Sequence, residues 1–72
     1  MQLIEEFVME FEALVRRVRG EFLEMPGLSL TMAQAERLWG LEQEVCRRVI
    51  GALIGSEFLR RTATGTIARA DA

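Results

Sequence analysis

The side chains with the greatest capacity for chemistry are paired arginines preceded by polar residues. In the segment "EQEVCRRVI", Gln43 and Glu44 precede Arg47 and Arg48 by three to five residues, which places the four on one side of a helix. A guanidinium group carries a permanent charge and five N–H donors, and it therefore suits the binding of anions such as phosphates. These residues predict a surface that docks an anion.

Other kinds of chemistry lack their usual side chains. The chain has no histidine and a single cysteine, Cys46, so a zinc site has no plausible ligand set and an internal disulfide cannot form. The usual general base is missing, and no serine or cysteine stands in a recognisable nucleophile setting. We therefore expect no enzyme activity, metal or cofactor. Cys46 falls on the apolar side of its helix, which predicts a core residue rather than a redox switch.

Length and charge restrict the possibilities further. A chain of 72 residues has room for one domain with a small core. The net charge of −2 argues against a strongly basic, nonspecific nucleic-acid binder. Residues 1–26 hold six glutamates and three arginines, whereas the remainder holds six arginines and five acids, so the second part is the predicted docking surface. No signal peptide or apolar run of about 20 residues is present, and we expect a soluble, cytoplasmic protein.

The elements that position these residues begin with a long helix. Apolar residues recur at the three- and four-residue spacing of one helical face. They are Leu3, Ile4, Phe7, Val8, Phe11, Leu14, Val15, Val18 and Phe22. The helix is predicted to run from about Gln2 to about Met25 and to end at Pro26-Gly27.

Two shorter helices and a hairpin are expected to follow. Thr31 is placed to cap the second helix, with Gln34 completing a capping box, and Gly40 can close it in a left-handed conformation. Trp39, just before the turn, is expected in the core. A third helix is predicted from near residue 42 to residues 55–57, with its apolar side inward. The segment "FLRRTATGTIARA" then predicts a two-stranded hairpin with a turn at residues 63–65.

This order of elements resembles the winged helix-turn-helix DNA-binding domains of bacterial transcription regulators. The resemblance covers roughly residues 10–70. It is carried by "LSLTMAQAERLWGL" for the second helix and turn, "EQEVCRRVIGALIGSEFL" for the third helix and "RRTATGTIAR" for the wing. It implies a mainly α fold with three helices, the first of them long, and a C-terminal two-stranded β-hairpin wing, all within a single domain spanning residues 1–72.

The resemblance also implies a function, in which the third helix enters the major groove of duplex DNA and the protein regulates transcription. An arginine can hold guanine with two hydrogen bonds and a glutamine can pair likewise with adenine, so Arg47 and Gln43 are the leading base readers. The residues implied to contact DNA are Gln43, Glu44, Arg47 and Arg48 of the third helix and Arg60, Arg61, Thr64 and Arg69 of the wing.

The first helix is longer than such a domain requires. Residues 1–10 form an N-terminal extension whose apolar side chains would lie exposed on a monomer, and a patch of this kind usually marks an interface. We expect a homodimer joined through Leu3, Ile4, Phe7, Val8 and Phe11. The alternative is that these residues fold back onto their own domain.

A different function also fits the sequence. The long first helix and the acidic balance are compatible with a protein-protein interaction or assembly module that uses a winged-helix fold without binding DNA. Winged helices are reused in this way, and fold alone does not decide between the two functions.

Overall fold

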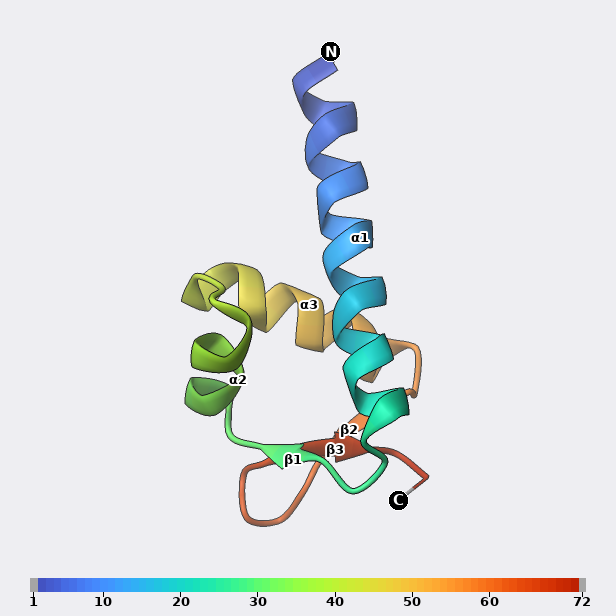
Figure 1. The fold of residues 1–72 in the computed structure, drawn as a ribbon, viewed down its shortest axis with the longest axis vertical. Helices are drawn as coiled ribbons and strands as arrows, with labels where there is room; N and C mark the ends of the chain where they lie inside the picture. Colours follow the sequence, from blue (N-terminus) through green and yellow to red (C-terminus); the bar gives the residue numbers. More distant parts are fainter. Residues whose placement is uncertain (1, 72) are drawn as a thin grey trace.

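The computed structural model describes the backbone of residues 2–71 and the side chains of residues 8–71. In this part of the chain it has three helices and a small antiparallel sheet (Figure 1). The elements are α1 (Gln2–Glu24), β1 (Ser29–Leu30), α2 (Met32–Trp39), α3 (Gln43–Gly55), β2 (Leu59–Arg61) and β3 (Ile67–Arg69). The prediction of a mainly helical chain ending in a hairpin is confirmed.

The long helix α1 has two parts with different surroundings. Its C-terminal part is anchored in the core, where Val18 and Phe22 are fully buried. Its N-terminal half extends away from α3 and the sheet, as Figure 1 shows, and the molecule is therefore 41 Å long but only about half as wide. None of the helices in the described range is both long enough and apolar enough to cross a membrane.

The ends of α2 are fixed by the local interactions that the sequence predicts. The Gln34 amide donates to Thr31 Oγ1 over 3.1 Å, and the Thr31 amide donates to Gln34 Oε1 over 2.9 Å, which completes the capping box. At the other end Gly40 adopts a left-handed φ of 63°, and the Leu41 amide donates to the Glu36 carbonyl. Both predictions about this helix are confirmed. The chain turns sharply at Gly40 before α3 begins.

The sheet has one more strand than the sequence predicts. Its order is β1-β3-β2, with both pairings antiparallel, so the two-stranded hairpin is extended by Ser29 and Leu30. Ser29 lies opposite Ala68 and Leu30 opposite Ile67. A two-residue strand is too short for an alternating pattern, and it forms because its partner strand is already in place. The extra strand makes β3 the central strand.

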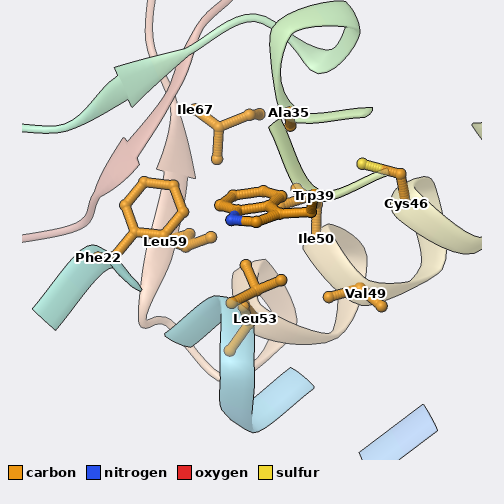
Figure 2. Close-up of a cluster of buried hydrophobic side chains, with 10 residues drawn as sticks. Phe22, Ala35, Trp39, Cys46, Val49, Ile50, Leu53, Leu59 and Ile67 are labelled. Carbon is orange, nitrogen blue, oxygen red and sulfur yellow. The ribbon is translucent and has the colours of Figure 1, made fainter. Parts of the chain in front are cut away.

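The core lies between the helices and the sheet, around Trp39. This side chain is 6% exposed, and its ring centroid is 6.0 Å from that of Phe22. Figure 2 shows the indole in the middle of the cluster, with Ile67 and Leu53 on opposite sides. The predicted core roles of Trp39 and Cys46 are confirmed, since both are buried. Leu59 and Ile67 join the hairpin to the same cluster.

Candidate functional site

The orientation of α3 follows from its apolar side. Cys46, Val49, Ile50 and Leu53 are buried, and the Cys46 thiol lies 3.7 Å from Met32 Sδ of α2. The opposite side of α3 therefore faces solvent. The residues predicted for DNA contact on this helix are all exposed there; they are Gln43, Glu44, Arg47 and Arg48.

Glu44 links the two arginines of this exposed face. Arg48 Nε donates to Glu44 Oε2 over 3.0 Å, and Arg47 Nη1 lies 3.9 Å from Glu44 Oε1. The Arg47 and Arg48 side chains are nevertheless 63% and 68% exposed. Exposed ion pairs contribute only about 0–1 kcal/mol, so an external anion can compete for both guanidinium groups at little cost.

The acidic residues at the start of α3 stabilise the helix but oppose the binding of an anion at its N-terminus. Glu42 is the N-cap residue without a side-chain capping hydrogen bond, and Glu44 lies in the first turn. Negative charge there favours the helix through its dipole. The same charge repels a phosphate that approaches the helix N-terminus. An anion is therefore better held by the arginines one turn further along.

The turn between β2 and β3 is held by a chain of hydroxyl groups. Thr62 Oγ1 lies 2.6 Å from Thr66 Oγ1 and 3.0 Å from Thr64 Oγ1, and the Ser29 hydroxyl of β1 donates to Thr66 Oγ1 over 2.9 Å. Gly65 takes a left-handed φ of 85° at the tip. These contacts fix the position of Thr64, a predicted DNA contact, relative to the sheet. The exposed Arg60 and Arg61 lie on β2, directly before this turn.

Arg69 differs from the other predicted contact residues because it is largely covered. Its side chain is 21% exposed, and Nη2 donates to Asp71 over 2.9 Å. The guanidinium lies over the Phe58 ring, 5.5 Å from its centroid, and Arg19 of α1 lies over the same ring at 4.7 Å. The sequence does not predict this stack, because its members are distant in the chain and no short-range pattern links them. Arg69 thus has less access to a ligand than Arg60 or Arg61.

The predicted dimer residues fall into two groups. Leu3, Ile4 and Phe7 lie outside the residues whose side chains the structure describes. Val8 is 46% exposed, whereas Phe11 is half-buried and packs against the core. The neighbouring Met9, which the prediction did not include, is 67% exposed. Apolar surface is therefore present on the described part of this extension.

Cys46 has the environment of a structural residue. Burial raises the pKa of its thiol, and the nearby Glu36 carboxylate raises that pKa further. The thiol is thereby kept protonated at neutral pH, and a protonated thiol is a poor nucleophile and metal ligand. Within the described residues, no group of three or more acidic or cysteine side chains is arranged to hold a metal ion.

Comparisons with known proteins do not assign the chain to a family. No protein-family profile, curated protein or solved structure matches the chain significantly.

Proposed function

We propose that this protein is a winged helix-turn-helix transcription regulator that binds duplex DNA as a homodimer and reads the major groove with α3. The observation that carries the proposal is the turn at Gly40, which leaves Arg47 and Arg48 exposed on the side of α3 away from the core. A helix with one buried face and one polar face is the element that such domains insert into the groove.

The exposed face of α3 has the groups needed to read bases. Arg47 can donate two hydrogen bonds to guanine O6 and N7, and Gln43 can pair with adenine. Each such contact contributes about 1–3 kcal/mol of discrimination between bases. Glu44 is released from its ion pairs as the arginines bind DNA, and it can accept a hydrogen bond from cytosine N4.

The β2–β3 turn supplies the contacts that are independent of sequence. Arg60, Arg61 and Thr64 are exposed beside a turn that hydroxyl contacts hold in place, and they contact phosphates or the neighbouring minor groove. Arg69 pairs with Leu59 at the end of the hairpin away from this turn, and it acts mainly through its stack on Phe58. Phosphate contacts make the affinity fall as salt rises.

The homodimer is supported by apolar surface on α1. Val8 and Met9 are exposed on the helical extension, beyond the part of α1 that the core covers. Burial of these side chains against a second chain removes apolar surface from water. It also enlarges the core of a domain that is small on its own.

A second candidate is an assembly module in which α2 and α3 meet another protein. Leu38, near the end of α2, is 52% exposed, and Glu44 already neutralises part of the charge of Arg47 and Arg48. Exposed apolar surface on α2 together with partly neutralised charge on α3 is compatible with a protein partner. Under this alternative, duplex DNA does not bind at moderate salt.

Fluorescence anisotropy with labelled duplexes tests the proposal. GC-rich and AT-rich duplexes are titrated with the protein at low and at moderate salt. We expect binding that weakens with salt, at about 0.9 in log K per log salt unit for each phosphate neutralised. Absence of binding to every duplex, even at low salt, would reject DNA recognition and favour the assembly module.

A further inference from the structure

An open hollow lies beside α1, at the point where the helix leaves the core. It has a volume of about 410 Å³ and is lined by Phe11, Glu12, Val15, Arg16 and Ala52. Ala52 comes from α3, so the hollow is a groove between the two helices. Three of its lining side chains are apolar, one is acidic and one is basic. The N-terminal turns of α1 extend away from α3 and the sheet, as Figure 1 shows.

The charges of α1 are separated along the helix. Residues 2–13 include four glutamates and no basic residue, whereas Arg16, Arg17 and Arg19 follow within six residues. In the described part of the chain, neither Arg16 nor Arg17 has an ion-pair partner. Both are exposed. One copy of α1 therefore has an acidic segment and a basic segment that can be complementary to those of another copy.

We propose that the hollow is occupied by the N-terminal segment of a second copy of this chain, with the two α1 helices antiparallel. This arrangement can place Glu5 and Glu6 of each copy beside Arg16 and Arg17 of the other. A parallel pair in register instead sets like charges against each other along the whole helix, which is unfavourable. The inference rests on the homodimer of the proposed function and specifies its geometry.

The position of the hollow sets the register of the pair. If Val8 of one copy packs over Val15 of the other, the two-fold axis passes close to Phe11 and Glu12. Position 12 then lies near position 12 of the other copy. Position 5 is opposite residue 18, so the two copies of position 5 are 13 residues apart along the axis, or about 20 Å at 1.5 Å per residue.

Thiol crosslinking distinguishes the two orientations. Glu12→Cys and Glu5→Cys are treated separately with a bifunctional maleimide much shorter than 20 Å, and the wild type is the control because its Cys46 is buried. We expect Glu12→Cys to form covalent dimers and Glu5→Cys to remain uncrosslinked. A mixture of Glu5→Cys with Arg16→Cys is expected to form mixed dimers. Circular dichroism checks that each variant keeps the helical content of the wild type.

The possible failures have different meanings. Efficient crosslinking of Glu5→Cys to itself indicates a parallel pair and overturns the inference, while the homodimer and its DNA binding stand. A dimer that none of the variants crosslinks places the interface elsewhere and also overturns the inference. A light-scattering mass equal to one 8.2-kDa chain, instead of two, overturns both the inference and the homodimer. DNA binding is measured separately by anisotropy.

Discussion

A pair of identical glycine-to-alanine substitutions is expected to change stability in opposite directions. At both Gly20 and Gly40 an added Cβ meets no atom within 4 Å, so steric contact does not determine the result. Gly20 lies inside α1, where alanine is favoured over glycine by about 1 kcal/mol. Gly40 has a φ of 63°, a conformation that costs an alanine about 1–2 kcal/mol. Gly20→Ala is therefore stabilising and Gly40→Ala destabilising.

Thermal unfolding followed by circular dichroism measures this difference. For a domain of this size, 1 kcal/mol shifts Tm by about 4–8 °C, so the two variants are expected to lie on opposite sides of the wild type by about that amount. All three proteins are compared at one concentration, because the proposed dimerisation would make Tm depend on concentration. A Gly40→Ala variant as stable as Gly20→Ala would show that no left-handed turn precedes α3. It would contradict the explanation that this turn leaves Arg47 and Arg48 exposed.

Two further predictions concern single side chains. Glu44→Gln removes the ion pairs of Arg47 and Arg48 together with a negative charge, and we expect its affinity for AT-rich duplexes, which offer few cytosines to the carboxylate, to rise by about twofold to tenfold in anisotropy titrations. Weaker binding to these duplexes would contradict this prediction. The fold favours the protonated form of the Cys46 thiol, because the pKa of this thiol is raised in the folded state. This contribution to stability is fully present below the ordinary thiol value of 9.0 and is lost as pH rises through the folded-state pKa. The chain has no lysine, tyrosine or histidine. Urea unfolding followed by Trp39 fluorescence should therefore show stability falling as pH rises above 9.0 in the wild type but not in Cys46→Ala. The same fall in both proteins would contradict the assignment of this pH dependence to Cys46.

The helices could be predicted from the sequence because short-range interactions determine them. The capping box of Thr31 and Gln34 spans three residues, and the left-handed turn needs only Gly40. The apolar spacing of α3 was enough to identify its buried side, and with it the exposed positions of Arg47 and Arg48. Glu44 stands three and four residues before these arginines, the spacing at which helical ion pairs form. The ion pairs themselves were not predicted.

Features that depend on long-range contacts could not be predicted in this way. Strand β1 has only two residues and exists because β3 lies beside it. As the central strand, β3 has Ala68 buried as well as Ile67, and its Arg69 stacks on Phe58. From the sequence, Arg69 is expected to contact DNA from a two-stranded wing. Arg69 is shielded from solvent by residues that lie close together only in the tertiary fold.

Charge reversal on α3 tests the central claim most directly. Arg47→Glu and Arg48→Glu are compared with Arg37→Glu, the same change at an exposed position of α2 that is part of neither the proposed DNA-binding face nor the proposed dimer interface. Each lost base or phosphate contact costs about 1–3 kcal/mol, and about 1.4 kcal/mol is a factor of ten, so we expect each α3 variant to bind duplex DNA at least about tenfold more weakly. Arg37→Glu should remain close to the wild type. Equal losses at all three positions, or no loss at any, would contradict the proposal that α3 is the DNA-reading helix.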